Sequence, residues 1–92
     1  MLLHSESFRM LTAHAMALAD RHCAGKLVVV HEGGYAEALV PFCGHAVVEA
    51  LSGQSLGVED PFLAFTRAQQ PTARFAAFQR GLIDEMSVAL QL

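Results

Sequence analysis

The chain has 92 residues, with six Lys and Arg against nine Asp and Glu, a net charge of −3 and 53% apolar residues. This length allows one domain at most, and the high apolar and low charged content exclude intrinsic disorder. Every stretch of about 18 residues carries polar groups, which excludes a membrane span. The acidic balance, with no basic stripe, argues against nucleic-acid binding. We find no signal peptide, and therefore expect a cytoplasmic protein with reduced cysteines.

The first helix is expected over residues 5–22. Apolar side chains recur there at the spacing of one helical face: Phe8, Leu11, Ala15 and Leu18. Ser5 or Ser7 would cap the start of this helix. Gly25 follows where a left-handed residue commonly ends a helix.

A strand is expected next, over residues 27–31. The segment is apolar in almost every position and rich in valine, a pattern typical of a strand covered on both faces in a parallel sheet. Gly33 and Gly34 break the strand and allow a tight turn. The chain offers no second strand candidate of comparable quality. A strand here would therefore need partners from outside these 92 residues.

Three more helices are expected, over residues 41–52, 61–68 and 72–90. Pro41 suits the first turn of its helix, and Asp60 followed by Pro61 forms a good helix entry, with Asp60 as the N-cap. The last helix carries apolar residues at helical spacing: Phe75, Phe78, Leu82, Met86 and Leu90. The order of elements predicts an α/β fold that is mostly helical, with one strand of the buried type.

A family resemblance rests on the segment around the two glycines. An apolar run from Lys26 leads into Glu32-Gly33-Gly34-Tyr35, and the following helix ends in Leu51-Ser52-Gly53. This order resembles the C-terminal part of histone deacetylase-like amidohydrolases of the bacterial class II type, which include acetylpolyamine amidohydrolases. The resemblance spans nearly the whole chain. It implies a single C-terminal segment, residues 1–92, of a three-layer α/β/α domain with the arginase-deacetylase fold.

The resemblance also implies a zinc-dependent hydrolase that removes acetyl groups from acetylated lysine or acetylated polyamines. The zinc ligands of that family, an Asp-x-His pair and a second Asp, and its histidine pair lie upstream and match nothing here. Only Tyr35 carries over, as a transition-state donor to the scissile carbonyl, with Gly33, Gly34 and Glu32 supporting the turn. We therefore expect this chain to bind no zinc and to be inactive alone.

Other readings of the reactive residues are weaker. His22 with Cys23, and Cys43 with His45, are the tightest pairs of potential metal ligands, but neither has the spacing typical of zinc sites. Nothing near either cysteine clearly lowers a thiol pKa, which argues against a nucleophile. The glycines lack the full pattern of a phosphate-binding loop.

A second hypothesis is a free-standing structural module without catalysis. In either case we expect a homo-oligomer, formed through Leu27–His31 and the apolar helix faces, or association with the missing N-terminal part of the domain. We expect neither nucleic acid nor membrane as a partner. The acylated substrate stays open between histone, polyamine and small metabolite, as does the number of subunits.

Overall fold

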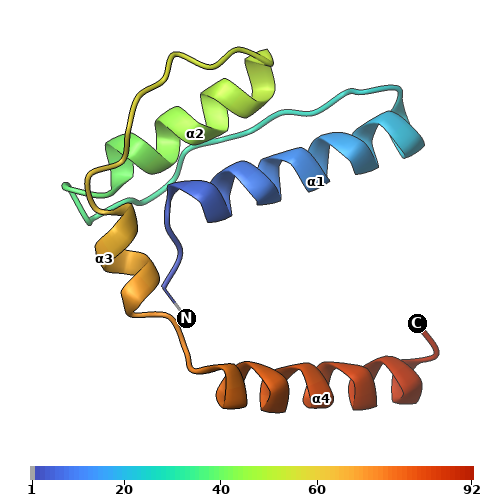
Figure 1. Ribbon diagram of the computed structural model, residues 1–92. Coiled ribbons are helices and arrows are strands. Elements are labelled where there is room, and N and C mark those ends of the chain that lie inside the picture. The colour runs from blue at the N-terminus through green and yellow to red at the C-terminus, as the bar shows by residue number, and fades with distance from the viewer. Residues whose placement is uncertain (1) are drawn as a thin grey trace.

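Four helices form the regular structure in the computed structural model, which describes residues 2–92 (Figure 1). In chain order, the helices are α1 Ser5–Cys23, α2 Val40–Ser52, α3 Leu63–Ala68 and α4 Ala73–Leu90. Their bounds lie within two residues of the ranges expected from apolar spacing. Long irregular segments connect α1 to α2 and α2 to α3.

The expected strand is absent from the described residues, so the prediction of an α/β fold is wrong. Residues 26–36 form an extended, irregular connection in which Val28 and Val30 are 86% and 80% exposed. A strand is stabilised by hydrogen bonds to a neighbouring strand. Within residues 2–92, no backbone hydrogen bond joins residues 27–35 to another segment. Valine content alone therefore does not produce a strand here.

The start of α1 is capped by His4, and not by a serine at the cap position. Nδ1 of His4 accepts a hydrogen bond from the backbone N–H of Ser7 at 3.3 Å, and the Ser7 hydroxyl oxygen accepts from the His4 N–H at 3.4 Å. This reciprocal pair is a capping box. The expectation for Ser5 was wrong, because Ser5 is the first helical residue. At the other end, Ala24 and Gly25 both have left-handed backbone angles.

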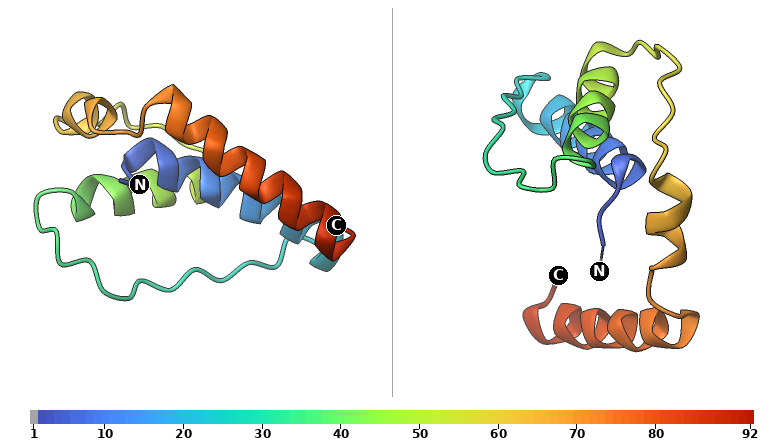
Figure 2. Two further views of the ribbon diagram at one scale, coloured as in Figure 1. Left: turned by 90° about the horizontal axis from the view of Figure 1, so that it is seen from below. Right: turned by 90° about the vertical axis from the view of Figure 1, so that its left-hand side faces the viewer.

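Packing is concentrated between α1 and α2, which lie side by side (Figures 1 and 2). Ala19 and Ala46 are the fully buried apolar residues among those described. Larger apolar side chains of α1 are exposed to solvent, since Leu11 and Leu18 are 54% and 55% exposed. The apolar face expected from their spacing is therefore largely exposed in this chain. The hydrophobic core is too small to cover the apolar faces of these helices.

The short helix α3 begins after a turn and not directly at Asp60. Asp60 Oδ1 accepts from the Phe62 N–H at 2.9 Å, and its carbonyl oxygen accepts from Leu63 N–H at 3.2 Å. Phe62 is the N-cap, so the expected cap at Asp60 was wrong by two residues. The Phe62 ring packs edge-on against Phe42 of α2, with centroids 6.1 Å apart. This contact fixes the start of α3 against α2.

Helix α4 lies apart from the other three helices (Figures 1 and 2). No residue between Ala73 and Leu90 is buried. The radius of gyration is 15.7 Å, whereas a compact domain of this length has about 12 Å. The accessible surface is 7451 Å², against about 5,200 Å² for a compact monomer of this mass. The chain therefore exposes far more surface than a self-contained domain.

Candidate functional site

The turn that carries Tyr35 is built by two glycines with left-handed backbone angles. Gly33 has φ +73° and Gly34 has φ +96°, a backbone region that residues other than glycine rarely adopt. A Cβ atom at Gly34 would lie 3.0 Å from His31 Nε2 and 3.1 Å from Val40 Cγ2. Gly34 therefore permits both the turn and its close approach to the first residue of α2.

Tyr35 projects from this turn and is 93% exposed. Its phenol forms no hydrogen bond within residues 2–92, and the ring lies beside Gly33, with Cε2 3.8 Å from where a Cβ would stand there. Glu32 is also exposed, and nothing in the described chain pairs with its carboxylate. The chain turns again directly after Tyr35, where Ala36 O accepts from Leu39 and Val40 N–H. Tyr35 thus lies five residues before the start of α2, with its side chain open to solvent.

An apolar groove of about 550 Å³ runs between the extended segment and α2. Its walls include Phe8 of α1, Val30 and His31 of the extended segment, and Val47 and Leu51 of α2. Gly34 also lines the groove, whereas Tyr35 does not. The four sequence-predicted residues are therefore divided: Glu32 and Gly34 line the groove, whereas Gly33 and Tyr35 do not.

Cys43 lies in the same groove and is partly buried. Burial raises the pKa of its thiol, and the nearby Asp60 carboxylate raises it further. A thiol with a raised pKa stays protonated at neutral pH and is a poor nucleophile. Cys23 is exposed, and its thiol donates to the Lys26 carbonyl oxygen at 3.2 Å. The geometry therefore gives no support to cysteine catalysis.

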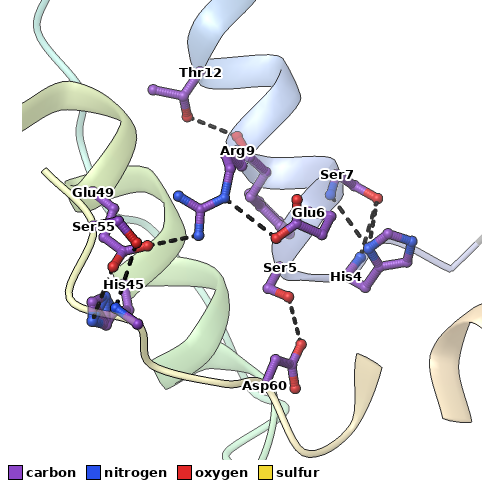
Figure 3. A network of polar contacts seen from close by, with 12 residues as sticks. His4, Ser5, Glu6, Ser7, Arg9, Thr12, His45, Glu49, Ser55 and Asp60 are labelled. Atoms are coloured by element: carbon purple, nitrogen blue, oxygen red, sulfur yellow. Dashed lines mark hydrogen bonds and ion pairs between the residues drawn. The ribbon is translucent and has the colours of Figure 1, made fainter. Parts of the chain in front are cut away.

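A polar network lies on the other side of α2, around a second cavity of about 480 Å³ (Figure 3). Glu49 is 5% exposed, and its Oε2 accepts from Arg9 Nη2 at 2.7 Å. Its Oε1 accepts from the Leu56 backbone N–H at 2.6 Å. Arg9 also pairs with Glu6 at 3.3 Å. These contacts fasten the α2–α3 connection to α1 and α2.

The hydrogen bond from Leu56 N–H is the main cause that lowers the pKa of Glu49, and the Arg9 guanidinium lowers it further. The same ion pair raises the pKa of Arg9. Ser5 completes the network, because its hydroxyl donates to Asp60 Oδ2 at 2.6 Å. No buried side-chain nitrogen or oxygen atom in residues 2–92 lacks a hydrogen-bond partner. Its arrangement is that of a structural clamp, and not of a catalytic carboxylate pair.

Glu49 was not singled out from the sequence. A signal existed, however, because Glu49 is the one acidic residue in the mostly apolar helix Val40–Ser52. It lies three residues after Ala46 and therefore shares its buried face. Its partner Arg9 is 40 residues away, a pairing that no local pattern specifies.

The described residues do not fit a zinc ion. No group of three or more His, Cys, Asp or Glu side chains converges anywhere in residues 2–92. A zinc site needs at least three protein ligands from this set. The pairs His22 with Cys23 and Cys43 with His45 gain no third ligand in the folded chain. In the same part of the chain, no helix has the length and apolar character needed to cross a membrane.

Two curated relatives show where the chain belongs. No model of a known protein family matches it. The chain is 53% identical over all 92 residues to a histone deacetylase-like amidohydrolase from Pseudomonas aeruginosa, and it spans 24% of that protein's length. It is 34% identical over 55 residues, or 59% of the chain, to a probable deacetylase from Archaeoglobus fulgidus, and covers 15% of that protein. The chain therefore belongs to the histone deacetylase-like amidohydrolase family, as a segment about one quarter as long as its Pseudomonas relative.

Proposed function

We propose that this chain contributes Tyr35 to the active site of a zinc-dependent deacetylase that hydrolyses acetylated lysine or acetylated polyamine. The observation that carries the proposal is the position of the phenol. Tyr35 follows a turn that only glycines readily form, and its hydroxyl has no partner within residues 2–92. A tyrosine held on a structured turn with a free hydroxyl is available to a substrate bound beside this chain.

The chemistry needs such a donor. When a nucleophile attacks an amide carbon, negative charge develops on the carbonyl oxygen. A pre-positioned hydrogen bond to that oxygen is commonly worth about 3–4 kcal/mol of transition-state stabilisation. The phenol of Tyr35 donates this bond, and Gly33 and Gly34 provide the backbone turn that aims the ring.

The remaining parts of the machinery belong to other residues of the enzyme. The Cys43 thiol is held protonated, and the carboxylates of Glu49 and Asp60 are engaged in structural hydrogen bonds. The donor set of residues 2–92 does not fit zinc, so that ion would be held outside this segment. We therefore propose that the segment is inactive alone and works against the rest of the deacetylase domain.

A chimaeric enzyme tests the role of Tyr35. The matching quarter of the Pseudomonas aeruginosa relative is replaced by this chain, and kcat and KM are measured on an acetyl-lysine peptide and on an acetylated polyamine. Tyr35→Phe should lower kcat about 10²–10³-fold with little change in KM, because the donor acts in the transition state. Comparing kcat/KM for the two substrates shows which class of acetylated substrate the chimaera prefers.

Glu37→Gln serves as a matched control for this experiment, because Glu37 is an exposed residue two positions after Tyr35. It should leave kcat unchanged. Thermal unfolding of both variants shows whether the chimaera keeps its fold. A Tyr35→Phe enzyme that is as fast as the unmodified chimaera would refute the proposed role.

A further inference from the structure

Helix α4 presents an apolar stripe that no other described part of the chain covers. Phe75, Phe78, Leu82 and Met86 are spaced three or four residues apart and so share one face of the helix. Their exposed fractions range from 45% to 61%. Phe75 and Phe78 already contact each other, with ring centroids 6.3 Å apart. A continuous apolar stripe of this kind marks an interaction surface.

The charges beside the stripe are asymmetric along the helix. Arg74 lies in its first turn and Glu85 in its last half. The two residues are eleven positions apart, close to three full turns, so they lie on the same edge of the stripe. A second α4 that runs antiparallel would place its Glu85 against this Arg74, and its Arg74 against this Glu85. A parallel copy would instead place this charged edge against the opposite edge of its partner, where these pairs cannot form.

The same antiparallel register also matches the apolar residues. With Arg74 opposite the partner subunit's Glu85, Phe78 lies within one position of the partner subunit's Leu82. Gly81 then faces the partner subunit's Phe78. A Cβ on Gly81 would meet nothing within 4 Å, so this edge of α4 is open to an aromatic ring. One register thus satisfies the charged and the apolar positions together.

We propose that α4 binds α4 of a second copy of this chain in an antiparallel pair about a two-fold axis. A surface that complements itself in both charge and shape is what a two-fold interface requires. The chain also exposes enough surface for such an interface. Each partner in a standard interface buries ~800 Å², and the accessible surface of this chain exceeds that of a compact monomer by more than this amount. This pairing is independent of the role of Tyr35.

Light scattering combined with size-exclusion chromatography, over a range of concentrations, tests the pairing with the 92-residue chain. The unmodified chain should be a dimer. Arg74→Glu should weaken dimerisation roughly tenfold, because two ion pairs per dimer become repulsive. Arg74→Glu combined with Glu85→Arg should restore it. Circular dichroism checks that each variant keeps its helices.

Arg80→Glu and Asp84→Arg provide matched controls, because both positions lie on the side of α4 opposite Leu82. Neither should change dimerisation. A chain that stays monomeric, or a dimer that the Arg74 and Glu85 variants do not alter, would overturn the proposal. A monomeric chain whose α4 amides become protected from hydrogen exchange only in the chimaera would also overturn the proposal. That result would assign the apolar stripe to the rest of the deacetylase domain.

Discussion

At the scale of single residues, one buried carboxylate connects three segments of this structure. Glu49 receives hydrogen bonds from Arg9 of α1 and from Leu56 of the following connection. Removing either hydrogen-bond donor would leave an oxygen of the nearly buried Glu49 carboxylate without a hydrogen bond, which would lower the stability of the fold. The family motif around Tyr35 is readable from the sequence, because glycines and a tyrosine follow one another directly. The Arg9–Glu49 clamp is not, because it depends on how α1 and α2 meet.

Acid should release the clamp. The pKa of Glu49 is lowered in the folded chain, so its ionised form stabilises the fold at any pH above its usual value of 4.5. This stabilisation disappears as the pH falls below 4.5 and through the lower folded-state pKa. The Leu56 amide resonance should shift and its hydrogen exchange accelerate in that range, as followed by NMR.

Two other titratable groups face Glu49: Arg9 from α1, and His45 from α2 at 4.0 Å. Glu6 pairs with the same arginine. Glu49→Gln should abolish the transition at Leu56, whereas His45→Gln should leave it in place. A Leu56 amide that titrates identically in the Glu49→Gln variant would contradict the assignment.

The backbone at Gly34 should reject any side chain. Gly34→Ala forces a methyl group into a left-handed conformation and to within 3.0 Å of His31. The strain should cost about 1–3 kcal/mol and shift the turn, with large chemical-shift changes over residues 31–36. Gly44→Ala is the control, because it lies within α2 with free space around it and should stabilise that helix by up to about 1 kcal/mol. Unchanged shifts in Gly34→Ala would argue against the observed turn.

At the scale of elements, helices could be predicted and the strand could not. Helical hydrogen bonds lie within the segment itself, so apolar spacing locates the helix ends closely, although the residues that cap α1 and α3 differ from those expected. A strand depends on a neighbour that may be far away in sequence. The valines of Leu27–His31 have no such neighbour among residues 2–92, and the segment remains an irregular connection.

Helix α4 should depend on its cap, because it buries no residue between Ala73 and Leu90. The Thr72 hydroxyl oxygen accepts from the Phe75 N–H at 3.4 Å. Thr72→Ala should cost about 1 kcal/mol of helix stability and reduce the helical signal measured by circular dichroism. Thr72→Ser keeps the hydroxyl and should retain most of that signal. Equal losses in both variants would show that the cap is not the cause.

At the scale of the whole molecule, the chain has the surface of a part and not of a self-contained domain. Its small buried core lies between α1 and α2, while α4 and the extended segment are open. It spans 24% of its Pseudomonas relative, and its residues do not fit the metal that the family resemblance implies. The large exposed surface is that expected of a segment about one quarter as long as its relative.

The most direct test is the rate at which the pure 92-residue chain, supplied with Zn²⁺, hydrolyses an acetyl-lysine peptide. In the proposed function this chain supplies one hydrogen-bond donor, Tyr35, and neither a nucleophile nor metal ligands. We therefore expect release of acetate at the uncatalysed background rate, both for the unmodified chain and for Tyr35→Phe. Zinc-dependent turnover above that background by the pure chain would refute the proposed function.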